Sequence, residues 1–309
     1  MKQNTFVSII VPTFDRHELL VDTLKGLLIQ EYEPKEIIVY DQSLQHSVEV
    51  GKFLTSISSQ IKYFRSNPRG LVFAYRRCVE LSKGDICFFV DDDVWIDDPD
   101  LVTRHVENYT NGLIGAVSGQ VLHEGQTATR PIDDRLYGPF GWRFTRFDIS
   151  QRLEALPSLS GANMSFRRSV YDRLGGFDQN YEGNGFRFET DFTFAVKSLG
   201  FQVIFDPEAS LTHRYGQPGG ADNRHLCSLQ NDSHHWYMQF FANTWYFLLK
   251  WYKMPTAARL IFSIWREHTF NRNSLRCGST FLLNRQWAFI SGIRLGQKMA
   301  AEWSPLQNG

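Results

Sequence analysis

The stretch "ICFFVDDDVWIDD", residues 86–98, decides how the rest of this chain is interpreted. An apolar run leads directly into three consecutive aspartates, Asp91, Asp92 and Asp93. Adjacent negative charges repel one another, and each loses hydration when it is even partly buried. The pattern therefore predicts a buried strand whose end needs a positive charge, supplied by a divalent metal ion or a basic side chain. A solvated acidic loop is the alternative.

Short apolar runs alternate with amphipathic stretches on either side of this motif. Strands are predicted at residues 6–12, 36–41, 61–66 and 85–93, and helices at 16–29 and 71–82. This alternation indicates an α/β fold with a mostly parallel central sheet and helices on both faces. Ligands of such sheets bind beyond the carboxyl ends of the strands, which places Asp15, Asp41 and Asp91–Asp93 along one edge.

The middle of the chain is less regular. Residues 112–122 read as a strand, and residues 123–158 as a long loop rich in glycine and aromatic residues, of a length that is usually functional or mobile. The segment "ETD", residues 189–191, opens a predicted helix, where acidic residues are also favoured by the helix dipole alone. His213 follows a strand predicted at 202–205 and is either structural or a ligand.

The composition narrows the class of protein. The chain has 33 basic and 33 acidic side chains, so its net charge gives no support to nucleic-acid binding. Its four cysteines are far apart, which argues against a disulfide framework and fits a reducing compartment. The first apolar run is short and leads into the first strand, unlike a signal peptide, and no run of 18 apolar residues exists. We therefore expect a cytoplasmic protein.

The C-terminal part differs from the rest in charge. Residues 236–309 hold nine Lys or Arg and two Glu, a net charge of +7, against −7 for residues 1–235. They begin with "WYMQFFANTWYFLLKWYK", in which aromatic residues are dense. This helix either packs on the rest of the protein or lies in a membrane interface, where Trp and Tyr prefer to sit. The positive charge favours the interface, and predicts peripheral attachment to the inner face of the plasma membrane through 236–309.

Taken in order, five segments resemble the family 2 glycosyltransferases of the GT-A fold. They are "VSIIVPTFDR", "VYDQS", "RGLVFAYRRCVELSKGDICFFVDDDV", "SGANMSFRRSVYDRLGGFD" and "ETDFTFAVKSLGFQVIFDPEASLTHR", which together span roughly residues 5–214. The resemblance implies a GT-A catalytic domain over 1–215, with a nucleotide-binding half (1–115) and an acceptor half (116–215). A lid loop and a helical, basic, aromatic extension then occupy 216–309.

The resemblance also implies roles for individual residues. Nucleotide contacts fall on Pro12, Thr13, Asp15, Asp41, Arg69, Asp91 and Asp92. Asp93 ligates Mn²⁺ or Mg²⁺, and His213 matches a histidine that joins the metal site in some members. Asp191 falls on the catalytic base. The family's "DDGS" reads "DQSL" here and its "ED" reads "TD", with Glu189 one position earlier, so Glu189 is the second candidate for the base.

These roles predict an inverting, metal-dependent hexosyltransferase of cell-surface or lipid-linked glycan synthesis. Its donor is a UDP- or dTDP-sugar, and its acceptor is a glycan or a lipid-linked sugar. We expect the loop 123–158 to contribute to acceptor binding through its aromatic side chains Tyr137, Phe140, Trp142 and Phe144. A sugar nucleotidyltransferase is the alternative enzyme, but "PTFDRHE" lacks the Gly- and Arg/Lys-rich phosphate loop that it needs. A non-catalytic sugar- or lipid-binding relative is the other alternative. The presence of both Asp93 and Asp191 argues against it.

Overall fold

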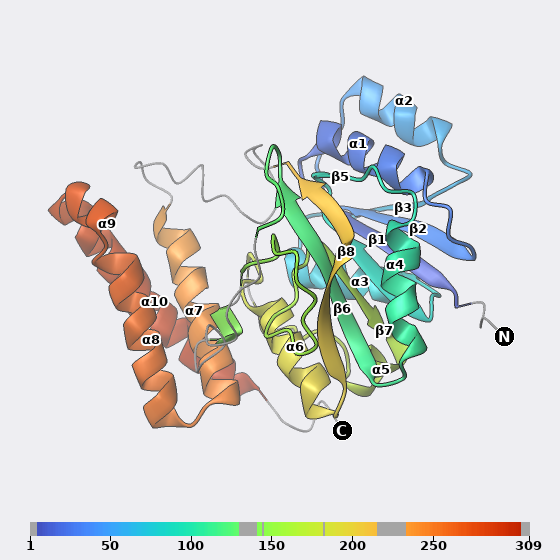
Figure 1. Ribbon diagram of the computed structural model, residues 1–309. Helices are drawn as coiled ribbons and strands as arrows, with labels where there is room; N and C mark the ends of the chain where they lie inside the picture. The colour runs from blue at the N-terminus through green and yellow to red at the C-terminus, as the bar shows by residue number, and fades with distance from the viewer. Residues whose placement is uncertain (1–4, 130–140, 144, 182, 215–232, 304–309) are drawn as a thin grey trace. The chain divides into compact units, whose positions relative to one another are not determined.

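The computed structural model of the 309-residue chain describes residues 5–129, 141–143, 145–181, 183–214 and 233–303. The chain divides into two compact units (Figure 1). Unit 1 comprises Met1–Arg69, Phe73–Phe177 and Glu189–Gly220, and unit 2 comprises Gly70–Val72, Asp178–Phe188 and Ala221–Gly309. The predicted lid loop after residue 215, and the predicted acceptor contacts Tyr137, Phe140 and Phe144, lie outside the described residues.

Unit 1 is built on an eight-stranded sheet of order β3-β2-β1-β4-β7-β6-β8-β5 (Figure 1). The first half of the sheet is parallel, with β2 beside β1 and β3 and with β4 on the other side of β1. Its strands are β1 (Val7–Thr13), β2 (Lys35–Asp41), β3 (Lys62–Arg65) and β4 (Ile86–Val90). Because these strands run the same way, Thr13, Asp41 and Asp91 all come at one edge of the sheet.

The second half of the sheet mixes directions. It contains β5 (Val94–Trp95), β6 (Ile114–His123), β7 (Asn163–Arg167) and β8 (Gln202–His213). β7 is antiparallel to both β4 and β6, whereas β8 runs parallel to β6 and antiparallel to β5. The strand predicted at 202–205 is therefore too short. It continues through a register shift between Gly119 and Gln120 of its partner, and His213 is its last residue rather than part of a following loop.

Helices cover both faces of the sheet, as alternate residues of β4 show. Phe88 packs in the core cluster that includes α1 (His17–Leu28), α2 (Val48–Ser56) and α4 (Leu101–Glu107). Phe89 points to the opposite face, where Tyr75 of α3 (Leu71–Leu81) stacks on it at 4.4 Å. The same face holds Phe166 and the aromatic residues of α5 (Arg168–Arg173) and α6 (Phe188–Ser198). The predicted fold class is confirmed, although α2 and β5 were not foreseen.

Unit 2 contains four helices in its described residues: α7 (Ser233–Trp251), α8 (Met254–Thr269), α9 (Arg272–Arg276) and α10 (Ser279–Glu302). Two glycines let α10 pack closely on α7. A Cβ atom at Gly292 or Gly296 would lie 2.6 Å from the carbonyl oxygen of Met238 or Ala242, respectively. Side chains larger than hydrogen at these positions would force the two helices apart.

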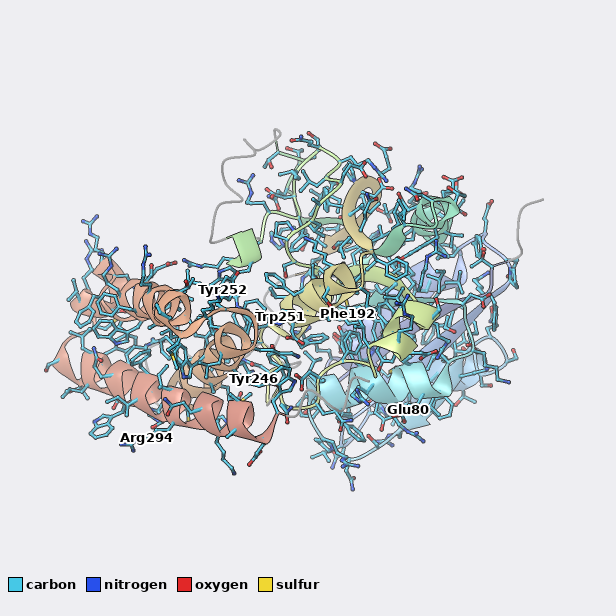
Figure 2. All side chains as sticks on the ribbon, turned by 90° about the horizontal axis from the view of Figure 1, so that it is seen from below. Glu80, Phe192, Tyr246, Trp251, Tyr252 and Arg294 are labelled. Atoms are coloured by element: carbon cyan, nitrogen blue, oxygen red, sulfur yellow. The ribbon has the colours of Figure 1, made fainter. Side chains whose placement is uncertain are left out.

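The segment 178–188 also belongs to unit 2, and a buried ion pair joins it to α7. Lys250 Nζ lies 2.7 Å from Asp178 Oδ2, and the hydroxyl of Tyr246, labelled in Figure 2, donates to the same oxygen at 2.6 Å. Burial raises the pKa of Asp178, but the charge of Lys250 and the two hydrogen bonds outweigh it and hold that pKa below its ordinary value. The carboxylate is therefore charged and satisfied inside unit 2.

The aromatic helix predicted to lie in a membrane interface is an interior helix. Phe240, Phe241, Trp245 and Phe247 of α7 are all buried. A helix that is apolar on most of its circumference is buried in a protein core, and α7 is such a helix. The interface prediction for residues 236–253 is therefore wrong. Within the described ranges, no helix combines the length and apolar character needed to cross a bilayer.

Candidate active site

The three aspartates stand at the carboxyl end of β4, as predicted. Asp92 and Asp93 are buried, and Asp91 is partly exposed. Burial, reinforced by the charge of the neighbouring aspartates, raises the pKa of Asp92 and of Asp93 above the ordinary range. The closely spaced carboxylates therefore repel one another, as the sequence predicts, and a nearby positive charge would stabilise their ionised forms.

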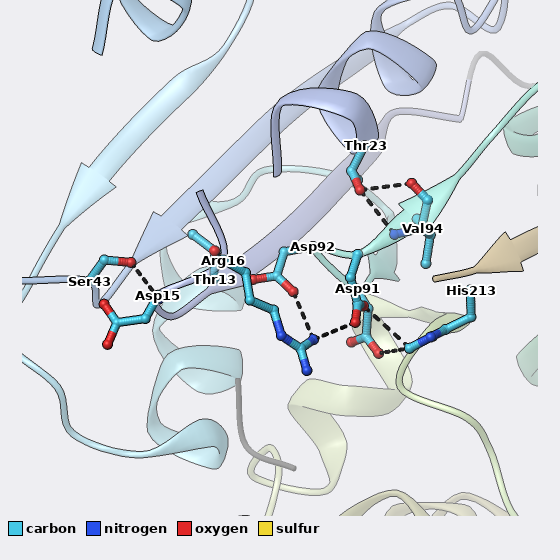
Figure 3. A network of polar contacts seen from close by, with 10 residues as sticks. Thr13, Asp15, Arg16, Thr23, Ser43, Asp91, Asp92, Val94 and His213 are labelled. Atoms are coloured by element: carbon cyan, nitrogen blue, oxygen red, sulfur yellow. Dashed lines mark hydrogen bonds and ion pairs between the residues drawn. The ribbon is translucent and has the colours of Figure 1, made fainter. Parts of the chain in front are cut away.

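Arg16 supplies that positive charge from the N-terminal end of α1 (Figure 3). Its Nη1 lies 2.6 Å from Asp93 Oδ2 and 3.2 Å from Asp92 Oδ1. Burial lowers the pKa of Arg16, but the charges of Asp92 and Asp93 outweigh it and raise that pKa above its ordinary value. The basic side chain was one of the two answers left open by the sequence, and Arg16 was not among the predicted site residues.

A second contact set is suited to a divalent cation. Asp91, Asp93 and His213 each offer a ligand atom, and these atoms lie within 4.8 Å of one another. His213 Nε2 is 3.3 Å from Asp93 Oδ1 and 3.5 Å from Asp91 Oδ2 (Figure 3). Val94 of β5 pairs with His213 of β8. This pairing brings His213 next to Asp93, although the two residues are far apart in the sequence.

The residues present fit Mn²⁺ or Mg²⁺. Asp93 Oδ1 is buried, and His213 Nε2 lies 3.3 Å from it without forming a hydrogen bond. An acceptor oxygen left in that state calls for a cation or a bound donor. Two carboxylates and an imidazole form a donor set that Mn²⁺ accepts readily, and the carboxylates alone suit Mg²⁺.

Replacing Arg16 with glutamine is expected to lower the melting temperature in the presence of a chelator and to enlarge the stabilisation by Mn²⁺. Removing one partner of a buried ion pair costs up to about 3–5 kcal/mol, because the other charge stays buried. A bound cation would offset that loss, since the carboxylates no longer have a competing guanidinium. Thermal unfolding with EDTA and with Mn²⁺ measures both effects.

Arg77→Gln is the matched control, because Arg77 forms an exposed pair with Glu80 and such pairs contribute little to stability. If Arg16→Gln unfolds at the temperature of the parent protein in EDTA, Arg16 is not the counter-ion of the aspartates.

Helix α1 is held so that Arg16 reaches this site. Thr23 on α1 donates its hydroxyl to the carbonyl oxygen of Val94 at 2.9 Å and accepts from the Val94 amide at 3.1 Å. Thr13, at the end of β1, donates its hydroxyl to Asp92 Oδ2 at 2.6 Å. These contacts fix the loop between β1 and α1 against the aspartates (Figure 3), so Thr13 and Arg16 act on the same carboxylate.

Asp41 lies one strand away in its own polar cluster. Its Oδ1 accepts from the Ser43 amide at 2.7 Å, and its Oδ2 accepts from the Tyr63 hydroxyl at 2.6 Å. His46 Nε2 is 2.9 Å from the same Oδ2, and the rings of His46 and His17 contact each other edge to face. Asp41 is fully buried, and its contacts with Tyr63 and His46 hold these two side chains at the end of β2.

The other predicted nucleotide contacts are spread along the same edge of the sheet. Pro12 is buried in β1. Asp15 is exposed and has a positive φ of 54°, and its amide donates to the Ser43 hydroxyl oxygen at 2.8 Å. Arg69 is exposed, its amide donates to Gln42 Oε1, and its guanidinium stacks over Phe73 at 4.0 Å.

The two candidates for the base sit differently in the first turn of α6. Asp191 is buried, whereas Glu189 is partly exposed. A Cβ atom at Gly161 would lie 3.0 Å from Glu189 Oε1 and 3.0 Å from the Tyr75 hydroxyl. The pKa of Tyr75 is raised first by burial and then by the charges of Asp91 and Glu189, so these groups are neighbours. These contacts place Glu189 beside Tyr75 and Gly161 in unit 1.

Sequence reasoning missed several residues of the site, among them Arg16, His46, Tyr63, Tyr75 and Gly161. Arg16 carried a usable signal, because it stands directly after the loop that closes the first predicted strand. Tyr63 and His46 had none, since their contact with Asp41 depends on how β2 and β3 pair.

The sheet order, the acidic cluster after β4 and the acidic first turn of α6 together define a GT-A-type glycosyltransferase. The chain belongs to glycosyl transferase family 2, whose sequence model matches residues 8–175. Asp91–Asp93 and β7 lie within the matched residues. The match ends before Glu189, Asp191, His213 and helices α7–α10.

Two curated relatives extend the similarity. Over 218 residues the chain is 26% identical to the glucosyl-dolichyl phosphate glucuronosyltransferase of Haloferax volcanii, covering 67% of this chain and 69% of the relative. Over 217 residues it is 23% identical to the O-antigen chain rhamnosyltransferase RfbN of Salmonella typhimurium, covering 68% and 66%. Both are glycosyltransferases, which supports the same broad class for this chain.

Solved structures confirm the fold. The mannosyltransferase PcManGT from Pyrobaculum calidifontis, in complex with GDP-Man and Mn²⁺, matches with a TM-score of 0.57 at 17% identity, over 99% of this chain and 78% of that one. GalNAc-T7 with UDP, GalNAc and Mn²⁺ matches with a TM-score of 0.56 at 14% identity, over 79% and 50%. At such low identity the likeness concerns the fold.

Proposed function

We propose that this protein transfers a sugar from a nucleoside-diphosphate sugar to an acceptor hydroxyl, with inversion at the anomeric carbon. The observation that carries the proposal is the convergence of Asp91, Asp93 and His213 beyond β4, with Glu189 close by. A diphosphate leaving group needs positive charge, and an attacking hydroxyl needs a base. The cluster offers the residues for both tasks at one edge of the sheet.

Each residue has a task in this proposal. Asp91, Asp93 and His213 would hold Mn²⁺ or Mg²⁺, and the ion would supply positive charge to stabilise the diphosphate leaving group. Asp92, oriented by Thr13, faces the ribose, and Asp41 with its neighbours Tyr63 and His46 faces the base. Arg69 and the Pro12–Asp15 loop complete the nucleotide contacts.

A carboxylate of α6 takes the proton of the acceptor hydroxyl. The sequence resemblance assigns this role to Asp191 and keeps Glu189 as the second candidate. The proximity of Glu189 to Gly161 and Tyr75 supports Glu189, because a base must reach the reacting oxygen within hydrogen-bond distance. Direct displacement with a single base inverts the configuration.

The acceptor is a growing surface glycan or a lipid-linked sugar, and the protein works at the inner face of the plasma membrane as a peripheral protein. Support comes from the names of the relatives, one acting on a glucosyl-dolichyl phosphate and one on an O-antigen chain. Trp142, the described member of the predicted acceptor set, is buried. The donor is a UDP- or dTDP-sugar in this proposal.

The proposal is tested with a panel of UDP-, dTDP- and GDP-sugars, each with Mn²⁺ and with EDTA. One nucleotide is expected to raise the melting temperature in Mn²⁺ only, since a ligand that binds the folded state stabilises it with the logarithm of its saturation. Release of the matching nucleoside diphosphate is then measured. A chain that is stabilised by no nucleotide in the presence of Mn²⁺ is not a transferase of this kind.

A further inference from the structure

Exposed apolar side chains are concentrated in the last helices of the chain. Twelve large hydrophobic residues are exposed among the described residues, and seven of them fall between Met254 and Ile290. The other five, Ile29, Leu44, Val48, Trp95 and Leu113, are spread over more than 80 positions of unit 1, and single exposed apolar residues are normal on protein surfaces. A concentration of this kind in one part of a molecule marks an interaction surface.

Helix α10 arranges part of this set in one stripe. Leu283, Trp287 and Ile290 follow one another at helical spacing and are 59%, 58% and 39% exposed. The stripe continues with Arg294, which projects from the helix in Figure 2. Lys298 follows it, with a side chain that is 72% exposed and an exposed, loose pairing of 3.8 Å with Glu302. The opposite face of α10, which includes Ala288, Gly292 and Gly296, is buried. The outer face is thus apolar at one end and basic at the other.

The charge of this part of the chain indicates what covers the stripe. From residue 254 to the C-terminus there are seven Arg or Lys and two Glu, a net charge of +5, so residues 1–253 have a net charge of −5. A second copy meeting the stripe face to face would bring two positive surfaces together, which disfavours self-association. An anionic lipid surface attracts the basic residues and accepts Trp and Leu at the headgroup level.

We propose that the outer face of α10, formed by Leu283, Trp287, Ile290, Arg294 and Lys298, docks unit 2 on the surface of an anionic lipid bilayer. This inference rests on the proposed membrane contact and gives it a location: the α10 stripe, in place of the aromatic helix α7. The helix lies in the interface and does not cross it, with its apolar end in the headgroup region and its basic end paired with lipid phosphates.

The test is co-sedimentation of the full chain with vesicles of phosphatidylcholine, with or without phosphatidylglycerol. The parent protein is expected to sediment with the mixed vesicles at low salt, and to be released as salt screens the attraction. Leu283→Ser and Trp287→Ser are each expected to weaken binding at least tenfold. The double variant Arg294→Gln, Lys298→Gln is expected to lose most of the preference for phosphatidylglycerol.

Leu113→Ser is the matched control, because Leu113 is 59% exposed, as is Leu283, but lies in unit 1. It is expected to bind as the parent does. The proposal fails if the parent stays in the supernatant with mixed vesicles at low salt, or if Leu283→Ser and Trp287→Ser bind as Leu113→Ser does. It also fails if light scattering shows a dimer that Trp287→Ser dissociates, since a second copy then covers the stripe.

Thermal unfolding confirms that each variant is folded. Stabilisation by nucleotide and Mn²⁺, measured without vesicles in the same samples, separates this inference from the proposed function. Loss of vesicle binding with nucleotide stabilisation retained concerns the α10 surface alone, and loss of nucleotide stabilisation in the parent protein concerns the function.

Discussion

Asp93→Ala is expected to reduce sugar transfer by roughly 10²–10³-fold or more and to remove the Mn²⁺ dependence of nucleotide binding. Asp93 is the residue shared by both contact sets of the site, since one carboxylate oxygen pairs with Arg16 at 2.6 Å and the other faces His213 at 3.3 Å. Alanine removes a ligand atom and leaves the guanidinium of Arg16 with Asp92 alone. Turnover and nucleotide affinity are measured across a series of Mn²⁺ concentrations.

Asp100→Ala is the matched control for this variant. Asp100 lies seven residues further along the chain, is exposed, and its side chain caps no helix amide, so its loss should leave turnover unchanged. If Asp93→Ala retains the activity of the parent protein in Mn²⁺, the metal assignment is wrong and Arg16 alone serves the aspartates.

Glu189→Gln is expected to lower turnover by about 10²–10⁴-fold while the affinity for the donor nucleotide stays near that of the parent. The amide keeps the shape of the side chain but cannot accept a proton, and the base acts on the acceptor rather than on the nucleotide. Asp191→Asn in the same turn is the comparison. It is expected to have the smaller effect on turnover, because Asp191 is buried while Glu189 borders Tyr75 and Gly161.

Steady-state kinetics with saturating donor, together with nucleotide binding by calorimetry, separate the two roles. A large loss of turnover in Asp191→Asn, with Glu189→Gln nearly as active as the parent, would return the base to the position that the family resemblance gives it. Equal losses in both variants, with donor affinity also reduced, would mean that neither carboxylate acts as the base alone.

The first half of the fold was predictable because its signals are local. Apolar runs bounded by Pro, Asp or Gly marked β1, β2, β3 and β4 to within a few residues, and leucines at helical spacing marked α1. The parallel arrangement followed from the alternation of strands and helices. Helix α2 escaped notice because it is short and has only two buried residues, Val50 and Leu54.

The second half depends on pairings between distant segments. The pairing of β5 with β8 determines that His213 lies beside Asp93, and no local pattern reports it. The ion pairs of Arg16 with Asp92 and Asp93 likewise join residues more than 70 positions apart. Residue types near strand ends could therefore identify candidates, but only the folded sheet shows which candidates meet.

The aromatic helix shows a different limit. Density of Trp, Tyr and Phe in residues 236–253 is compatible with a membrane interface and with a protein core, and the sequence alone offers no way to count the neighbours that cover a helix. The structure buries most of these rings, those of Trp236, Phe240, Phe241, Trp245, Tyr246 and Phe247. The exposed stripe of α10 contains fewer aromatic residues than residues 236–253, so aromatic density did not identify it. The helical spacing of Leu283, Trp287 and Ile290 is nevertheless present in the sequence.

The ion pair between Asp178 and Lys250 limits how this chain could be recombined with its relatives. The chain passes through unit 2 at 178–188, returns to unit 1 with α6, and enters unit 2 again before α7. A chimera that exchanged only the C-terminal helices would therefore separate Asp178 from the lysine that neutralises it. The segment 178–188 and helices α7–α10 are expected to be inherited together, as one split module interleaved with the catalytic sequence.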